Sequence, residues 1–421
     1  MVTAVVLRPA DADAEANEQL SFAETTAANV AARVALVAPR GQTQLDGRIR
    51  TAQAKVRERP DEVARWERLA TLFITKARVT GDPGHYQQAE ACADAMPTED
   101  GGADAAALLR GHVRHALHDF DAAERIARDL VARRGSLRDH GLLGDVLLDR
   151  GQLDAAERSY QAMLDLRPGL LSYSRAAELQ WLRGNHAACR RLLADAAAAG
   201  SRRDPESLAW VLARRGRLEL ESSDAEAALQ FAERALELVD NHPAALLVQG
   251  RAALALDRTD LALTSLAAAA AAYPLPQHLW GHAEALTRAG HTSAVETTLA
   301  ELRANGREDP RTFALWLATR GEHPELAVRH ATAEAALRQD AQTLDVLGFA
   351  LLRAGDVAGS NATLDRALAT GLDCARLHLH AALARHAVGA PFAAHLERAD
   401  AGRAALWPSE QRELDRLIAG R

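Results

Sequence analysis

The chain contains 421 residues, of which 48% are hydrophobic and 25% charged, and its formal net charge is -7. This charge argues against a general binder of nucleic-acid backbones, which needs a basic face, and no apolar run reaches the roughly 20 residues that cross a bilayer. We therefore expect no nucleic-acid partner, no membrane span and a cytoplasmic location; export with a signal peptide removed is the alternative.

The first 41 residues are predicted to be an N-terminal extension that is partly disordered or forms one helix. We expect residues 1–17 to be mobile, whereas residues 18–37 have the apolar spacing of an amphipathic helix. Residues 42–60 predict a further helix that ends at Pro60. We interpret this helix as the second helix of a degenerate first repeat.

Nine turn positions recur along the rest of the chain at intervals of 31 to 39 residues, most of them 33 or 34. They are His118, Gly151, Gly184, Ser223, Asp257, Gly290, Gly321, Gly355 and Gly389. Seven residues before each turn lies a small residue: Gly111, Gly144, Ala177, Gly216, Gly250, Ala283, Ala314, Gly348 and Ala382. Two helices can cross closely only where their side chains are small, so this spacing predicts helix pairs joined at these turns.

The longest interval, between Gly184 and Ser223, predicts a kink between two arrays of repeats. We expect an N-terminal array in residues 42–200 and a C-terminal array in residues 201–400. Residues 401–421 are predicted to be a capping helix, because the last repeat of an array needs a polar outer face. No stretch alternates with period 2, so we expect no sheet.

Three stretches carry a recognisable pattern. Leu143–Pro168 reads L-G-x-x-L-L-x-x-G-x-L-x-x-A-x-x-x-Y-x-x-M-L-x-x-x-P, Leu347–Leu368 is a second copy, and Trp66–Met96 is a third with extra residues in its turn. These stretches resemble tetratricopeptide repeats, and the chain from about Pro60 to Arg398 resembles the bacterial proteins of that family that carry no catalytic domain. The resemblance implies an all-α fold: a right-handed α-solenoid of tandem helix-turn-helix repeats.

The resemblance also implies where a partner binds. The first helix of each pair lines an inner groove, and the residue after the small position points into it. Those residues are His112, Asp145, Glu178, Arg217, Arg251, Glu284, Leu315, Phe349 and Leu383. Acidic, basic and apolar positions follow one another, which suits a protein or peptide ligand of mixed charge with an apolar anchor. The alternative is that these charged residues are only solvated and bind no particular ligand. No asparagine lies two residues before a small position, so we expect no clamp for a C-terminal carboxylate.

The chain lacks the motifs of common enzymes. It contains no phosphate loop, no H-E-x-x-H and no G-x-S-x-G. We therefore predict a non-catalytic, monomeric scaffold for protein interactions that needs no cofactor and no metal. Two alternatives stay open: a regulatory subunit of a partner enzyme, or a metal- or solute-handling accessory protein that uses histidine clusters. The clusters are His112, His115 and His118, and His378, His380 and His386.

Overall fold

The computed structural model describes residues 29–80, 82 and 84–420, which form helices joined by short turns. Within these residues there is no strand, so the all-α expectation is confirmed. The predicted extension lies outside the described residues up to residue 28, and residues 29–35 are helical. No helix in the described part of the chain is both long and apolar enough to span a membrane.

The chain divides into two compact units, Met1–Arg134 and Gly135–Arg421. The division lies at residue 134; the boundary near residue 200 between two arrays of repeats stays a prediction. After residues 29–35, the first unit contains α2 (Gln44–Glu58), α3 (Val63–Thr80), α4 (Gly84–Ala95), α5 (Gly102–Ala116) and α6 (Phe120–Arg133). Its core is built around Ile49, Trp66, Leu69 and Phe73.

The second unit contains the remaining helix pairs. They are α7 (Leu137–Asp149) and α8 (Leu153–Leu166), α9 (Leu170–Leu182) and α10 (His186–Ala198), α11 (Pro205–Glu221) and α12 (Ala225–Leu238), α13 (Pro243–Ala255) and α14 (Thr259–Ala272), α15 (Pro276–Arg288) and α16 (Thr292–Ala304), α17 (Pro310–Arg320) and α18 (Pro324–Leu337), α19 (Ala341–Arg353) and α20 (Val357–Ala369), and α21 (Ala375–Ala387) and α22 (Ala393–Ala401). The 3-10 helix η1 (Arg403–Ala405) and α23 (Pro408–Ala419) follow.

The turns explain why the pairs form. All of the predicted turn positions have a positive φ, from 57° at Ser223 to 88° at Gly355. Glycine adopts this left-handed conformation without steric cost and so ends the first helix of a pair. At several turns the next residue caps the second helix, as where Asn185 accepts a hydrogen bond from the backbone of Ala188 at 3.2 Å.

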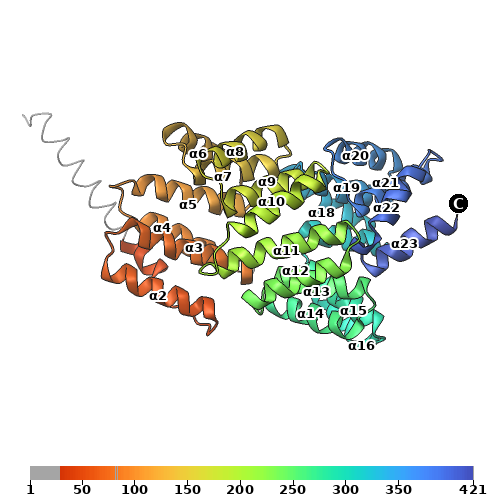
Figure 1. Cartoon of the computed structure of the whole chain (residues 1–421), viewed down its shortest axis with the longest axis horizontal. Coiled ribbons are helices and arrows are strands. Elements are labelled where there is room, and N and C mark those ends of the chain that lie inside the picture. Colours follow the sequence, from red (N-terminus) through yellow and green to blue (C-terminus); the bar gives the residue numbers. More distant parts are fainter. Residues whose placement is uncertain (1–28, 81, 83, 421) are drawn as a thin grey trace, which may run out of the picture. The chain divides into compact units, whose positions relative to one another are not determined.

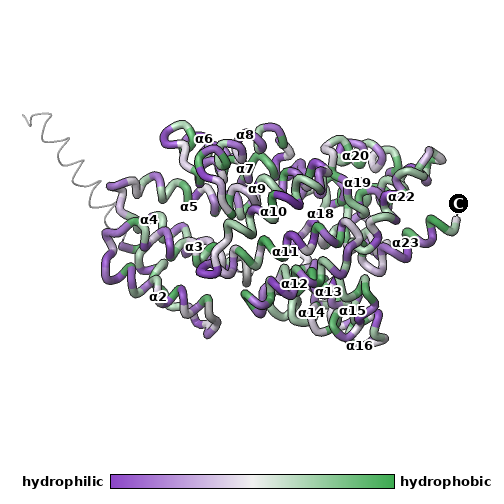
Figure 2. The backbone as a smooth tube through the Cα atoms, in the orientation of Figure 1, coloured by the Kyte–Doolittle hydropathy of each residue, from purple (hydrophilic) through white to green (hydrophobic). Residues whose placement is uncertain are grey.

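The small positions lie where the paired helices cross. A Cβ atom added to Gly144 would collide with the ring of Tyr160, and one added to Gly250 would collide with Leu266. Hydrophobic and hydrophilic stretches follow one another along many of the helices, as expected where one face is buried (Figure 2). Pairing, turn conformation and close crossings together confirm the predicted tandem helix-turn-helix repeats.

The second unit returns on itself. The backbone N–H of Gln339 donates to the carbonyl of Asp149 at 3.2 Å, so the loop before α19 meets the turn after α7. The carbonyl of Gly371 likewise lies against Gly184, so the loop before α21 meets the turn after α9. Figure 1 shows α19 and α20 near α9 and α10. The first helices of the pairs, which contact one another in succession, thus enclose a common inner surface.

Candidate functional site

The inner surface of the second unit consists of side chains on the first helices α7, α9, α11, α13, α15, α17, α19 and α21. At its start, on α7, Asp145 accepts two hydrogen bonds from the guanidinium of Arg175, 2.9 Å from Nε and 2.8 Å from Nη2. The hydroxyl of Tyr160 donates to the same carboxylate at 3.0 Å. Asp145 is therefore neutralised by its own chain, in the bidentate geometry that guanidinium groups favour.

The next two predicted positions contact each other. Arg217 on α11 lies with Nη2 3.4 Å from the Glu178 carboxylate, and its guanidinium covers the indole of Trp181 at 4.3 Å from the ring centroid. Burial lowers the pKa of Arg217, and the charge of Arg311 on α17 acts in the same direction. The side chain of Arg217 nevertheless keeps 30% of its surface exposed. Arg217 is therefore within reach of a ligand.

Further along, the inner surface is covered by the C-terminal segment, which we define as residues 401–413. Arg251 on α13 donates a hydrogen bond to the backbone carbonyl of Ala405, and its guanidinium lies over the ring of Trp407 at 4.8 Å. Trp407 is 4% exposed. Burial lowers the pKa of Arg251 to about 10, and Arg376 adds to the effect. Arg251 thus holds a peptide, and that peptide belongs to its own chain.

Glu284 on α15 holds the same segment. Its carboxylate accepts hydrogen bonds from the hydroxyl of Ser409 and from the indole N–H of Trp280, the latter at 2.9 Å. Burial raises the pKa of Glu284, and these two hydrogen bonds oppose the rise. The carboxylate therefore serves a buried contact within the chain.

Two ion pairs complete this attachment. Glu410 is 1% exposed and receives two hydrogen bonds from Arg376 on α21, and Glu413 pairs with Arg353 on α19. Burial disfavours the charged form of Glu410, but Arg376 outweighs this, so the pKa of Glu410 lies below its ordinary value. A buried carboxylate is stable only with such a partner.

The apolar positions are part of the core. Phe349 is 1% exposed and stacks on the imidazole of His380 with centroids 3.8 Å apart. Leu315 is 6% exposed, and Leu383 packs against the cluster that contains Leu406 and Leu414. Of the predicted positions in the second unit, Asp145, Glu178 and Arg217 remain accessible. The structure places Arg251, Glu284 and Phe349 in contacts within the chain.

His112 lies on α5, in the first unit, and is half-exposed. The rings of His115 and His118 both contact Phe120, and His118 is the left-handed turn residue after α5 rather than part of that helix. Within the described residues, no group of three or more His, Cys, Asp or Glu side chains has an arrangement that could hold a metal ion.

The second histidine cluster is divided between two sides of α21. His378 lies with one ring nitrogen 2.9 Å from Asp373 and the other 2.9 Å from His395. His380 instead contacts Asp345 on α19 at 2.7 Å. The ring of His386 lies edge-on to Phe392. These contacts give each histidine of the cluster a structural role.

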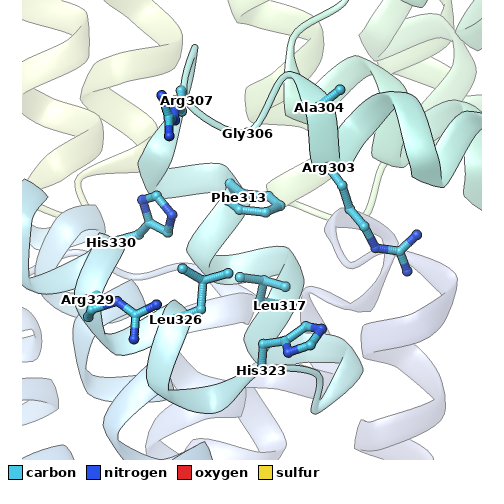
Figure 3. A pocket seen from close by; sticks show the side chains of 10 residues that line it. All are labelled: Arg303, Ala304, Gly306, Arg307, Phe313, Leu317, His323, Leu326, Arg329 and His330. Carbon is cyan, nitrogen blue, oxygen red and sulfur yellow. The ribbon is translucent and has the colours of Figure 1, made fainter.

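A separate cavity of about 550 Å³ lies between α16, α17 and α18 (Figure 3). The rings and side chains of Phe313, Leu317 and Leu326 line its apolar part, and its charged rim consists of Arg303, Arg307 and Arg329. Arg303 pairs with Glu322 at 3.3 Å. Sequence reasoning did not single out this cavity, because none of the three stretches with a recognisable repeat pattern covers α17 and α18.

The C-terminal segment was missed as a functional element. Its helix was expected, but not its position on the inner surface. Trp407 is the signal that could have indicated this, because a tryptophan next to a proline at the start of a polar helix needs a buried contact. The role of Arg175 was also not predicted, although this residue lies 30 positions after Asp145, on the first helix of the next pair.

Comparisons with known proteins concern the fold. No protein-family model matches the chain, and no curated protein matches it in sequence. Among solved structures, Pseudomonas aeruginosa PilF is 16% identical with a TM-score of 0.41, covering 55% of this chain and 97% of its own. A tetratricopeptide repeat protein from Parabacteroides merdae is 13% identical with a TM-score of 0.38, covering 68% and 99%.

Yeast Tom70 is similar over a longer part of the chain. It is 11% identical with a TM-score of 0.33, and the match covers 89% of this chain and 95% of Tom70. At identities and TM-scores this low, the activities and partners of these proteins belong to them alone.

Proposed function

We propose that the chain is a non-catalytic scaffold that binds a segment of a partner protein on the inner surface of its second unit. One observation carries this proposal: the same surface already holds a polypeptide, the C-terminal segment. The contacts are those that peptide recognition uses, namely a guanidinium on a backbone carbonyl, a buried tryptophan and carboxylates paired with arginines.

The part left for a partner is the accessible stretch around Asp145, Glu178 and Arg217. Arg214 and Arg217 share the single carboxylate of Glu178, so this stretch favours a ligand that brings a carboxylate of its own. A single carboxylate on the ligand is enough, because Asp145 is already neutralised by Arg175 and only Arg214 and Arg217 share one carboxylate. If the partner is an enzyme, the same surface serves a regulatory subunit.

Site-specific photo-crosslinking in the native cell tests this proposal. A photoreactive amino acid replaces Arg217 on the inner surface, and in a matched variant it replaces Glu233, which is exposed on α12. We expect a discrete cross-linked protein with the first variant and none with the second. Equal cross-linking at both positions, or none at Arg217, would overturn the proposal.

A second comparison separates partner binding from folding. Arg217→Gln removes the accessible charge but leaves the contacts of Arg251 and Glu284 with the C-terminal segment in place. In this comparison the photoreactive amino acid replaces Arg214, and Arg217 is either kept or changed to glutamine. We expect the change at Arg217 to weaken the cross-link while the melting temperature changes little. A partner recovered equally well with Arg217→Gln would show that Arg217 does not bind it.

A further inference from the structure

We propose that a basic groove between α2 and α3, in the first unit, binds an acidic amphipathic segment of a protein partner. The groove encloses about 620 Å³. Its lining residues are Gly47, Arg48, Thr51, Ala52 and Lys55 of α2, and Ala64, Arg65, Arg68 and Leu72 of α3. This surface is separate from the one in the proposed function, so each proposal can fail without the other.

The charges of the groove come from one face of each helix. Arg48 and Lys55 are seven residues apart on α2, and Arg65 and Arg68 are three apart on α3, so each pair projects from the same side of its helix. Among the described residues that line the groove, every charged one is basic. The whole chain carries a net charge of -7, so the sign of the charge in this groove is opposite to that of the whole chain.

Three of these cations have no counter-charge among the described residues. Arg65 pairs with Glu62 and lies 3.4 Å from Glu58. Within the part of the chain that the structure describes, the side chains of Arg48, Lys55 and Arg68 make no ion pair and no hydrogen bond. All three are exposed. Like charges gathered around one groove repel one another, and an anionic ligand relieves that repulsion.

The floor of the groove is aliphatic. Ala52 is 6% exposed and Leu72 is 3% exposed, and Thr51 and Ala64 also line the groove. Small and apolar residues between two helices accept the apolar side of a third helix or of an extended peptide. A ligand with leucine or alanine on one side and carboxylates along its edges therefore matches both the floor and the rim.

A nucleic acid fits this groove less well. Single strands bind through aromatic side chains on which bases stack, and none of the described residues that line the groove is aromatic. The arginines alone would hold phosphates, but the aliphatic floor would meet no apolar surface. The chemistry of the floor thus favours a peptide.

The lysine content of the chain offers a direct readout. Lys55 and Lys76 are its two lysines. Lys76 is 9% exposed and pairs with the buried carboxylate of Asp46, whereas Lys55 is exposed in the groove. An amine-acetylating reagent should therefore modify Lys55 rapidly and Lys76 slowly. Lys76 serves as the internal reference.

The experiment uses the full chain and a synthetic acidic helix, acetyl-EALAELAEALAELA-amide, as the probe. We expect saturating probe to slow acetylation of Lys55 at least about tenfold without changing that of Lys76. The basic counterpart has arginine in place of each glutamate, so it carries no amine that consumes the reagent, and it should not protect Lys55. Added salt should weaken the protection, as for any contact between exposed charges.

Matched variants assign the effect to the groove. Arg48→Glu with Arg68→Glu should weaken binding of the acidic probe at least about tenfold, while Arg33→Glu with Arg125→Glu, which makes the same change in net charge elsewhere in the first unit, should leave it nearly unchanged. Both pairs are exposed, so circular dichroism should report equal helix content. An equal loss in both pairs would reduce the effect to net charge and overturn the proposal.

Two other outcomes would also overturn it. Protection of Lys55 by a ten-nucleotide oligothymidine but not by the peptide would assign the groove to nucleic acid. The chain's own residues 1–28 contain Asp11, Asp13, Glu15, Glu18 and Glu24. If deletion of residues 2–28 alone made Lys55 markedly more reactive, the occupant would be this segment and not a partner.

Discussion

The indole of Trp407 lies against the indole of Trp280, with ring centroids 5.8 Å apart and ring planes inclined by 40°. Trp280 belongs to α15, and Trp407 precedes the last helix of the chain. This contact joins the C-terminal segment to one large core that includes Leu279, Phe313 and Trp316. The segment is therefore an integral part of the second unit.

Replacement of Trp407 by alanine should destabilise the second unit by about 3–5 kcal/mol, the usual cost of removing a buried aromatic side chain. Denaturant unfolding followed by circular dichroism measures this cost. Trp210 is 38% exposed, so Trp210→Ala is the matched control and should cost about 1 kcal/mol or less. If the two variants unfolded alike, Trp407 would not be a structural anchor.

The close helix crossings predict opposite effects for two Gly→Ala substitutions. At Gly250 the added Cβ collides with Leu266, so Gly250→Ala should cost about 1–3 kcal/mol through overpacking. At Gly47, inside α2, the added Cβ meets no atom of the described residues within 4 Å. Gly47→Ala should therefore stabilise the first unit by about 0.5–1 kcal/mol through helix propensity. Thermal denaturation of both variants checks the sign, and a gain at Gly250 would contradict the crossing.

The turn conformation can be tested without any change in packing. Gly290 has a φ of 78°, and a Cβ there would have no neighbour within 4 Å. Gly290→Ala should cost about 1 kcal/mol from the left-handed conformation alone. Gly290→Asn should cost less, since asparagine tolerates that conformation better. Equal stability of the glycine and alanine proteins would show that the turn relaxes.

The sequence was informative where structure depends on neighbours in the chain. Turn glycines such as Gly151 and small residues such as Gly144 act within one helix pair, so their spacing predicted the repeats and their boundaries. The same reasoning predicted first-helix positions for Arg217 and Arg251. It could not tell that one would be accessible and the other covered.

That difference depends on contacts between distant parts of the chain. Arg251 meets Ala405 and Glu284 meets Ser409 only because the repeats curve until α21 and the segment after it return to α13 and α15. The curvature accumulates from small rotations between neighbouring pairs. No local motif specifies where the accumulated rotation places the C-terminal segment. The sequence around Ser409 is that of an ordinary helix N-terminus, so it gives no sign of the contact with Glu284.

His242 gives the second unit a dependence on pH. It is the N-cap residue of α13, 4% exposed, and its Nδ1 accepts a hydrogen bond from the backbone N–H of Ala245 at 3.2 Å. Burial lowers its pKa from the ordinary 6.5 to about 4. A protonated imidazole has no acceptor nitrogen, so protonation also removes the cap.

The sign follows from proton binding. Between about pH 6.5 and pH 4 the unfolded chain binds the proton and the folded chain does not, so stability falls as the pH falls through this window. The loss should reach at most about 3 kcal/mol, reduced by Glu206, whose carboxylate lies 3.7 Å from Nε2 and favours the charged ring. Urea unfolding at pH 7 and pH 5 measures it. His242→Asn keeps a capping oxygen and should flatten the dependence of stability on pH. His291→Asn is the control and should leave that dependence unchanged, because His291 is an exposed N-cap residue whose side chain makes no capping hydrogen bond. The same slope in all three proteins would show that His242 does not control it.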